Sequence, residues 1–387
     1  MNVLKLVSRN LFRNKLRTFL TILGLSFAVF AFGFLRTIVT AWYYGVEASS
    51  SSRLITRHAV SFIYPLPLSY RDQIEKVPGV KSVSFAYWFQ GVYKDNTFDN
   101  FFPRYAVDAE TFLEMYPEFV IPADQLETFK KERNSCIVGQ KIMDKYGWKI
   151  GDVIPIEGDI FPGHWQFVIR GIYKGKDRIT DETQMFIQWS YVDEKLKQDA
   201  PYRAGQVGWY AVQISNPNDA ASISETIDGL FANSSAKTKS ETEKAFQQSF
   251  VSLSGAILTS LEVISYVIIG IILLVLANTI IMSARERIRE YAVLKTLGFN
   301  SGHIMGLVAG ESLIIAMIGG LLGVIFTFPM AAAVAAGFPT MFPIFKVEPS
   351  TIILAFGFSF LVGILASIFP AMRSARMKIV DGLRQIG

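Results

Sequence analysis

Residues that commonly build active sites are scarce in this 387-residue chain, which has one cysteine and three histidines. A single cysteine excludes an intramolecular disulfide and any metal site built on cysteine pairs, and we expect Cys136 to be a small buried apolar residue. The histidines, His58, His164 and His303, lie in three separate regions of the sequence. This scatter argues against a shared metal or catalytic site.

The common nucleotide-binding and hydrolase motifs are missing as well. The sequence contains no G-x-x-x-x-G-K-[ST], and therefore no phosphate-binding loop of that type, and no H-E-x-x-H, C-x-x-C or G-x-S-x-G. We therefore expect a chain with no catalytic residues and no bound cofactor or metal. A membrane-anchored enzyme with a site of a new kind stays open as an alternative class.

Positive charge is present but unevenly placed, with a net charge of +5. Thirteen Lys and Arg residues lie in residues 1–17, 284–303 and 371–387, which hold only three carboxylates. Residues 44–254 carry 23 basic and 27 acidic residues and are mildly acidic. Because the basic segments flank apolar runs, membrane orientation and lipid headgroups explain them, and a nucleic-acid surface does not.

Four apolar runs are each of a length that suits a membrane span, which needs about 20 residues. They are Thr18–Leu35 (extendable to Trp42 if Arg36 reaches the interface), Val263–Met282, Ser312–Ala336 and Thr351–Met372. The first run is longer than the apolar core of roughly 7–15 residues in a signal peptide, and no A-x-A site follows it. We expect it to be an uncleaved anchor.

The distribution of Lys and Arg places both termini and residues 284–303 in the cytoplasm, and residues 44–254 and 337–349 outside. The predicted organisation is a basic N-terminal helix with the first span (1–43), an outer α+β domain (44–254), the second span (255–283), a charged elbow (284–303), the third span (304–336), a short outer loop (337–349), the fourth span (350–373) and a basic tail (374–387).

The two ends of the outer domain have the same order of elements. The first end predicts a strand over 59–64, a helix capped by Ser69 and ended by Pro78-Gly79, and a strand from Val80. The second predicts a strand over 208–214, a helix capped by Asn218 and an extended segment at 236–240. Two β-α-β units of this kind can pair into one split layer.

Residues 100–200 look like an insertion between those units, and we expect them to form a separate lobe. Residues 153–158 and 165–173 alternate as strands, and residues 138–152 predict a short helix followed by a glycine turn. Aromatic residues are frequent here, and a core role is the main expectation, with a protein-contact surface as the alternative. They include Phe101, Phe102, Phe112, Tyr116, Phe161, Trp165 and Trp189.

The stretch "SARERIREYAVLKTLGF", residues 283–299, predicts a charged helix that continues the second span, ends at Gly298 and is followed by a helix capped by Ser301. Opposite charges at Arg285, Glu286, Arg289 and Glu290 are spaced for pairing along the helix. A stiff charged elbow suits a protein that is moved by a partner. A polar loop that only orients the spans is the equal alternative.

Two carboxylates lie at or near membrane depth. We expect Glu262, at the outer start of the second span, to be interfacial and solvated. For Glu311, about two turns into the third span, an interhelical hydrogen bond and a functional role remain equally open.

"NTIIMSARERIREYAVLKTLGFNSGHIMGLVAGESLIIAMIGGLLG" resembles the most characteristic stretch of the MacB/FtsX-type (type VII) ABC transporter permeases. "RNLFRNKLRTFLTILGLSFAVF" and "IFPAMRSARMKIVDGLRQ" are similar to the first span and the C-terminal end of that family. The elbow positions that the resemblance assigns to ATPase coupling are Arg285, Glu286, Arg287, Arg289, Glu290, Lys295, Leu297, Gly298 and His303. Those it assigns to membrane packing are Glu311, Gly319, Gly320 and Gly323.

The resemblance implies four transmembrane helices, and a large outer α+β domain between helices 1 and 2 that combines a porter-like layer with an inserted Sabre-like subdomain. It implies a homodimer in the bacterial inner membrane, driven by a cytoplasmic ABC ATPase dimer that binds ATP and Mg²⁺ on separate chains. The output would be mechanotransmission, the transfer of ATP-driven motion to the outer domain.

Several outputs are compatible with that architecture. The size of the outer domain favours MacB-like export of a periplasmic or membrane-derived substrate, with a periplasmic adaptor and an outer-membrane channel. FtsX-like activation of cell-wall hydrolases and extraction of lipoproteins or lipids are the alternatives. No residue identifies a substrate.

Overall fold

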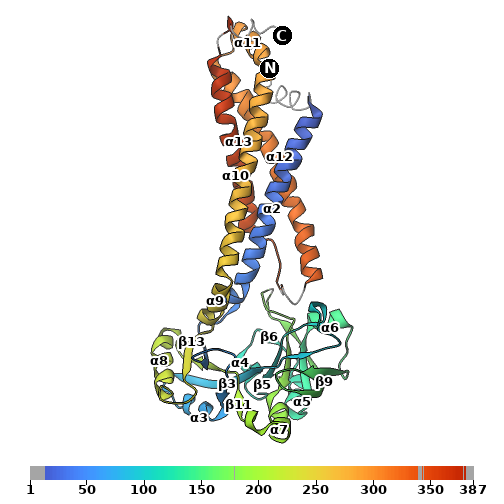
Figure 1. Cartoon of the computed structure of the whole chain (residues 1–387), viewed down its shortest axis with the longest axis vertical. Helices are drawn as coiled ribbons and strands as arrows, with labels where there is room; N and C mark the ends of the chain where they lie inside the picture. The colour runs from blue at the N-terminus through green and yellow to red at the C-terminus, as the bar shows by residue number, and fades with distance from the viewer. Residues whose placement is uncertain (1–13, 178, 339–341, 343, 378, 381–387) are drawn as a thin grey trace. The chain divides into compact units, whose positions relative to one another are not determined.

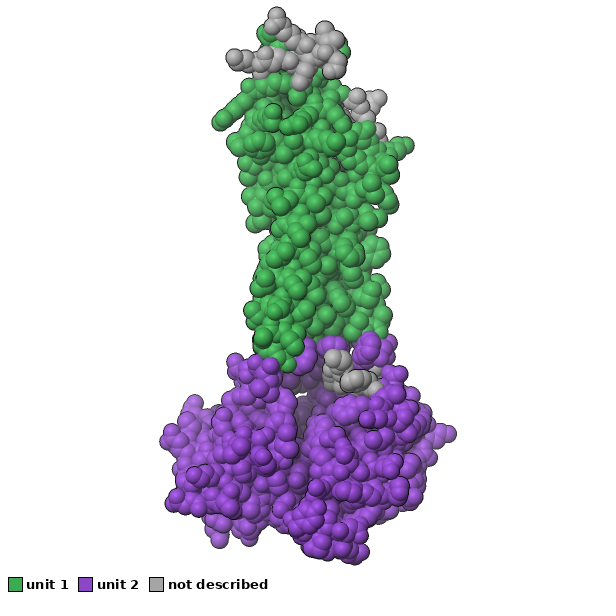
Figure 2. All heavy atoms as spheres, in the orientation of Figure 1, with its two compact units in different colours: residues 1–41, 254–334, 345–387 green, residues 42–253, 335–344 purple. Residues whose placement is uncertain are grey.

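The computed structural model describes residues 14–177, 179–338, 342, 344–377 and 379–380. The chain divides into two compact units (Figure 2). A helical unit holds residues 1–41, 254–334 and 345–387, and the outer domain holds residues 42–253 and 335–344. The predicted basic positions Lys5, Arg9, Arg13, Lys378 and Arg384 lie outside the described residues.

Four helices of the described chain are long and apolar enough to cross a membrane, which confirms the four predicted spans. They are α2 (Lys15–Ala48), α10 (Gly255–Glu286), α12 (Ser301–Gly337) and α13 (Pro349–Arg376), with the short α11 (Ile288–Thr296) between α10 and α12. Each helix is longer than its apolar run. In the helical unit, the start of α2, the end of α13 and α11 lie at the same end of the bundle (Figure 1).

Small residues set the spacing of the bundle. A Cβ built on Gly319 would lie 2.4 Å from Leu25 Cδ2, and one on Gly323 would lie 2.6 Å from the Ser26 carbonyl oxygen. Both glycines therefore lie where α12 approaches α2 too closely for a side chain. Gly320 has the same relation to Ser359 of α13, with the built Cβ 2.3 Å from Oγ. Close approach at small residues is a usual way for membrane helices to pack.

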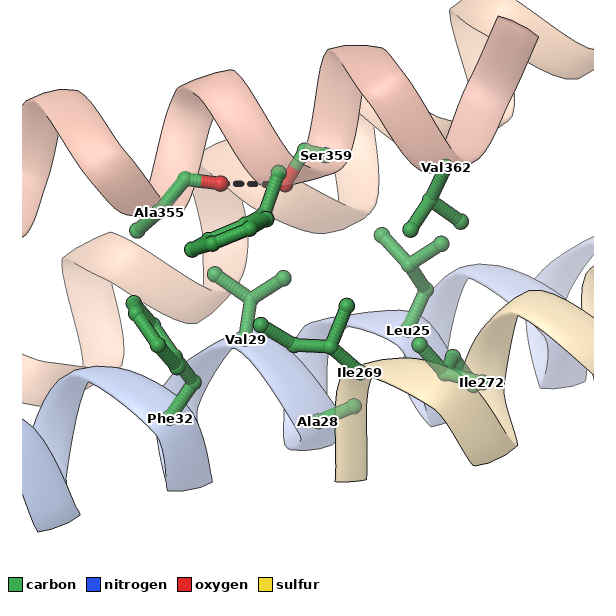
Figure 3. A pocket seen from close by; sticks show the side chains of 10 residues that line it. Leu25, Ala28, Val29, Phe32, Ile269, Ile272, Ala355, Ser359 and Val362 are labelled. Atoms are coloured by element: carbon green, nitrogen blue, oxygen red, sulfur yellow. Dashed lines mark hydrogen bonds between the residues drawn. The ribbon is translucent and has the colours of Figure 1, made fainter. Parts of the chain in front are cut away.

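Between α2, α10 and α13 lies a small pocket lined almost entirely by apolar side chains, among them Leu25, Phe32 and Ile272 (Figure 3). Its hydroxyl group, on Ser359, donates to the Ala355 carbonyl of the preceding turn at 2.9 Å. The one hydroxyl proton of the lining is therefore used within its own helix. The pocket belongs to the apolar core of the bundle.

The outer domain is built on a split β-α-β layer, as predicted. The strands β1 (Arg53–His58), β3 (Val80–Trp88), β12 (Trp209–Ile214) and β13 (Thr238–Thr242) are ordered β13-β1-β12-β3, and every neighbouring pair is antiparallel. The helices of the two β-α-β units are η1 (Leu68–Tyr70) with α3 (Arg71–Ile74), and η4 (Pro217–Asp219) with α8 (Ala220–Leu230). A final helix, α9 (Glu243–Leu253), leads to α10.

Some predicted boundaries of this layer are wrong. The first strand covers residues 53–58 instead of 59–64. Its arginines, Arg53 and Arg57, look like loop residues in the sequence but are paired with glutamates of other elements. The last strand begins at Thr238 instead of residue 236. Neither Ser69 nor Asn218 caps a helix, because Ser69 lies inside η1 and Asn216 accepts the capping hydrogen bond from the Asn218 amide.

The inserted segment continues the same sheet. Its strand β5 (Arg104–Val107) pairs with the end of β3, and β10 (Met185–Gln188), β7 (Ser135–Gly139), β9 (Gly163–Gly175), β8 (Val153–Gly158) and β4 (Gly91–Val92) follow in that order. The short β6 (Phe119–Val120) pairs with β9, and β2 (Leu66–Pro67) pairs with β11 (Gln206–Val207) in a separate two-stranded sheet. The prediction of a separate lobe is therefore wrong, since sheet and core run through both parts.

The insertion also holds α4 (Phe112–Met115), α5 (Ala123–Lys131), α6 (Gln140–Tyr146), α7 (Trp189–Asp199), η2 (Phe98–Asn100) and η3 (Pro201–Arg203). The predicted strands and the helix with its glycine turn are confirmed, with Gly147 left-handed at φ 66°. Six of the seven predicted aromatic residues are buried, Phe101 being the exposed one, and Cys136 is buried and free. The aromatic residues therefore form core.

Candidate functional site

The elbow, residues 284–303, has a defined backbone. α10 ends at Glu286, Arg287 leaves helical geometry at φ −105° and ψ 10°, and α11 starts at Ile288. The prediction of one uninterrupted helix from the second span is thus wrong, because the helix breaks at Arg287. At the end of α11, the Phe299 amide donates to the Leu294 carbonyl and the Gly298 amide to the Lys295 carbonyl, both at 3.1 Å.

Gly298 adopts φ 90°, a left-handed conformation that glycine reaches without a steric cost. Together with the two preceding hydrogen bonds this forms a Schellman motif, which ends α11 as predicted. The next helix is capped by Asn300, whose Oδ1 accepts from the His303 amide at 3.0 Å. The predicted cap, Ser301, instead donates its hydroxyl to the Ala375 carbonyl at the end of α13.

An ion pair connects the elbow to the start of the first span. The Arg17 guanidinium donates to both carboxylate oxygens of Glu286, at 2.7 and 2.9 Å, and Asn14 donates to the same carboxylate at 3.2 Å. The sequence suggested pairing of Glu286 along its own helix. The structure shows instead that its carboxylate binds α2.

A second, buried ion pair connects the elbow to the third span. Arg287 and Glu311 are 6% and 7% exposed, and Arg287 Nη1 donates to Glu311 Oε2 at 2.7 Å. Ser283 Oγ donates weakly to the other carboxylate oxygen, at 3.4 Å. Consecutive residues at the break, Glu286 and Arg287, are therefore held in different directions, one by α2 and the other by α12. Glu311 makes the interhelical contact that was one of its two predicted readings.

A third contact connects the elbow to the fourth span. The Lys295 ammonium donates to the carbonyls of Ala375 and Met377, at 2.6 and 2.7 Å. These carbonyls lie at the C-terminal end of α13, where a cation is also favoured by the helix dipole. The elbow is therefore tied to α2, α12 and α13 by three charged side chains on its inner side.

The opposite side of the elbow is exposed and partly apolar. Leu297 is 70% exposed and Val293 is 44% exposed. The other exposed positions of the elbow are Arg285, Glu286, Arg289, Thr296, Gly298, Asn300, Ser301, Gly302 and His303, whereas Glu290 is half-buried. Leu297 and Val293 therefore give this side of the elbow a small apolar part among polar residues.

Tyr291 fixes the base of α11. Its ring is buried, and burial raises the pKa of its hydroxyl to about 12. It therefore stays neutral at physiological pH. Together with the buried Ala292 it packs the start of α11 into the bundle, so that this part of the elbow is held by apolar contacts as well as by charge.

The outer domain contains a comparable junction around Arg53. This residue opens β1, shortly after the end of α2, and its side chain is 4% exposed. Its guanidinium contacts Glu243, the first residue of α9, at 2.9 Å and Glu118 of the insertion at 2.5 Å. It also donates to the Met115 carbonyl at 3.1 Å and lies over the Tyr116 ring.

Glu243 also binds the segment between α2 and β1, by accepting from the Ser50 amide at 2.9 Å. Burial raises the pKa of its carboxyl, against the opposing effect of Arg53. One guanidinium thus joins the chain arriving from α2, the chain leaving toward α10, and the inserted segment. Sequence reasoning missed this junction, because its members lie far apart in the chain and form no local motif.

Four helices able to span a membrane, with an α+β domain between the first two of them, define a polytopic membrane protein. Two family models match the chain: the MacB-like periplasmic core domain over residues 18–230 and the FtsX-like permease C-terminal domain over residues 262–379. The chain belongs to the MacB/FtsX-type ABC transporter permeases.

Two relatives agree with this assignment in sequence. An ABC transporter permease of Methanocaldococcus jannaschii is 23% identical over 372 residues, which cover 90% of this chain and 75% of that protein. The macrolide export ATP-binding/permease protein MacB of Bdellovibrio bacteriovorus is 30% identical over 130 residues, 33% of this chain but only 19% of that protein. The periplasmic region of MacB from Actinobacillus actinomycetemcomitans, a solved structure, covers 53% of this chain and 95% of its own length at 12% identity and a TM-score of 0.38.

Proposed function

We propose that this chain is the membrane subunit of a MacB-like ABC transporter, in which ATP hydrolysis on a separate cytoplasmic ATPase changes the conformation of the outer domain by mechanotransmission. The function would be export of a periplasmic or membrane-derived substrate across the cell envelope. The chain would work as a homodimer in the inner membrane of a bacterium, with both termini and the elbow in the cytoplasm, together with a periplasmic adaptor and an outer-membrane channel.

The elbow is the observation that carries this proposal. Leu297 and Val293 offer an apolar contact at its tip, while Glu286, Arg287 and Lys295 bind three different spans on its inner side. A partner that pushes on the tip would displace α2, α12 and α13 together. A polar loop that only orients the spans would need none of these three contacts.

The junction around Arg53 in the outer domain also supports the proposed transfer of motion. Arg53 joins the segments connected to α2 and α10 to the inserted part of the sheet. A movement of either helix would therefore reach the insertion through a buried, charged contact. The MacB-like match over residues 18–230 favours export over FtsX-like activation of cell-wall hydrolases.

The ATP and Mg²⁺ of the cycle would be bound by the partner ATPase. In this chain the elbow would only receive the motion. The exposed Arg285, Arg289 and His303 would add polar contacts around Leu297, and lipids would surround the outward faces of the spans.

The test is a pull-down of the full chain from its native membrane in mild detergent, followed by identification of the bound proteins. We expect a P-loop ATPase to co-purify with the wild-type chain and to be lost from the Leu297→Asp variant. Leu230→Asp is the matched control, since Leu230 is a half-exposed leucine at the end of α8 in the outer domain. Equal ATPase recovery with both variants would overturn the docking role of the elbow.

The other proteins recovered decide the output. A periplasmic adaptor would support export. A cell-wall hydrolase or its activator in place of the adaptor would assign the chain to the FtsX-like regulators.

A further inference from the structure

An exposed apolar surface lies on the outer domain where the chain leaves and re-enters the membrane spans. After β1, the loop of residues 59–64 exposes Val60, Ile63 and Tyr64, which are 76%, 70% and 55% exposed. Apolar side chains at this density are unusual on the surface of a soluble domain and indicate a surface that is covered by something else.

The loop is joined to α9 by aromatic contacts. Phe62 packs against Phe250 with ring centroids 5.0 Å apart, and Phe250 packs against Phe246 at 5.6 Å. Leu253, at the end of α9, is 79% exposed. We call this set, namely Val60, Phe62, Ile63, Tyr64, Phe250 and Leu253, the aromatic rim.

The end of α2 lies beside the same helix. A Cβ built on Gly45 would be 3.6 Å from the side-chain oxygen of Gln247, so residues 42–48 of α2 run next to α9. The chain leaves the first span along α2 and enters α10 along α9, so the two segments run in opposite directions. With a rise of about 1.5 Å per residue, Trp42 and Phe250 lie at the same level, each three residues from that contact.

Trp42 and Tyr43 are themselves exposed aromatic residues that end the apolar run of the first span. Tryptophan and tyrosine at the end of a span are typical of the membrane–water interface. An interfacial Trp42 would bring Phe250 and the loop packed on it to the level of the interface.

Charge distribution agrees with that level. Residues 37–46, 59–70 and 245–261 contain no Asp, Glu, Lys or Arg, and they include the end of the first apolar run, the loop of the rim and most of α9. Apolar segments with Trp and Tyr at the end of a span are typical of the boundary between acyl chains and headgroups.

We infer that the aromatic rim is a membrane-interface anchor, in which the loop of residues 59–64 inserts into the headgroup region of the outer leaflet. The occupant of this surface is the lipid of the surrounding bilayer. The anchor would fix the level of β1, and with it Arg53 and the junction, relative to the membrane surface.

The test uses the full chain in vesicles of phosphatidylethanolamine and phosphatidylglycerol. A nitroxide label on Ile63→Cys is compared with one on Tyr202→Cys, a 75% exposed aromatic position in η3 of the insertion. The native Cys136 is buried and should remain unlabelled in the folded protein. The readout is the accessibility of each label to O₂, which concentrates in lipid, relative to a water-soluble nickel chelate.

We expect the ratio of O₂ to nickel accessibility to shift toward O₂ at position 63 and to stay at the value of a water-exposed site at position 202. The same water-exposed ratio at both positions would overturn the proposal. Shielding of position 63 from both reagents would also overturn it and would point to a second copy or another protein on the rim. Val60→Cys provides a second exposed label site in the same loop.

Discussion

Arg287 and Glu311 form a buried ion pair between the break at the end of α10 and the helix α12, with 2.7 Å from Nη1 to Oε2. The adjacent Glu286 is bound to Arg17 of α2. The structural consequence is that the position of the elbow depends on two spans at once. A change in either pair should therefore be detected in the coupling of the transporter.

Removing one partner of the buried pair should be severely destabilising. In Glu311→Ala the Arg287 guanidinium stays buried without its carboxylate, and such a loss typically costs about 3–5 kcal/mol. The double variant Arg287→Met with Glu311→Leu removes both charges, and we expect it to recover most of the loss. The measurement is thermal unfolding of the detergent-purified chain for the wild type, Glu311→Ala and the double variant.

Glu262→Gln is the control for the loss of a charge in a span, because the Glu262 carboxylate of α10 is exposed. This variant should leave the unfolding temperature unchanged. If the double variant were as unstable as Glu311→Ala, the ion pair would not be the source of the effect.

The Arg17–Glu286 pair should matter little for stability. Glu286 is 44% exposed, and ion pairs in contact with solvent typically contribute about 0.2–1 kcal/mol. We expect the free energy of unfolding of Glu286→Gln to differ from that of the wild type by no more than this amount. The same variant should lower the stimulation of ATP hydrolysis in the assembled transporter. Charge exchange, Arg17→Glu with Glu286→Arg, should restore stimulation. Failure of the exchange to restore it would show that Glu286 acts through another group.

The α2–α12 contact should be intolerant of larger residues. In Gly323→Val the new side chain would meet the Ser26 carbonyl and Val29, because even a Cβ would lie 2.6 and 2.7 Å from them. Overpacking of this kind costs about 1–3 kcal/mol or more. Gly270→Ala is the control, since a Cβ there meets nothing within 4 Å, and it should be neutral or slightly stabilising. Equal unfolding temperatures for the two variants would contradict the close approach.

Much of this structure could be predicted from the sequence because its signals are local. Each span is one continuous apolar run. Gly298 ends α11 because glycine adopts the left-handed conformation without a steric cost, which can be recognised from the residue type alone. The split β-α-β layer was predictable from the order of strands and helices. Its first strand was misplaced because Arg53 and Arg57 are neutralised by residues distant in the sequence.

The internal contacts of the elbow could not be predicted for the same reason. Glu286 lies 269 residues from Arg17, and only the packing of α2 against α10 brings them together. The spacing of charges along the helix predicted that Glu286 pairs with a neighbour on its own helix, whereas in the structure it pairs with Arg17. Likewise, Ser301 was a plausible cap by residue type, but the end of α13 competes for its hydroxyl and Asn300 caps α12 instead.

The junction of the outer domain should respond to mild acid through Glu243. Burial raises the pKa of this carboxyl in the folded state, so the folded protein binds a proton at a pH where the unfolded chain does not. The free energy of unfolding that Glu243 contributes is therefore fully present below its ordinary pKa, and it is lost as pH rises through the raised value. Thermal unfolding of the wild type, measured from pH 7 down to pH 4, should show this contribution of Glu243 to stability appearing as the pH falls.

Glu243→Gln removes the titrating group and keeps its shape. The pH dependence of the free energy of unfolding between the ordinary and the raised pKa of Glu243 should therefore disappear in that variant. Glu241→Gln is the matched control, because Glu241 is also paired with an arginine, Arg57. Opening of the junction would return Glu243 to its ordinary pKa, so by the same linkage we expect mild acid to increase the protection of the amides of residues 243–246 against exchange. An identical pH profile for the wild type and Glu243→Gln would show that this carboxyl is not the titrating group.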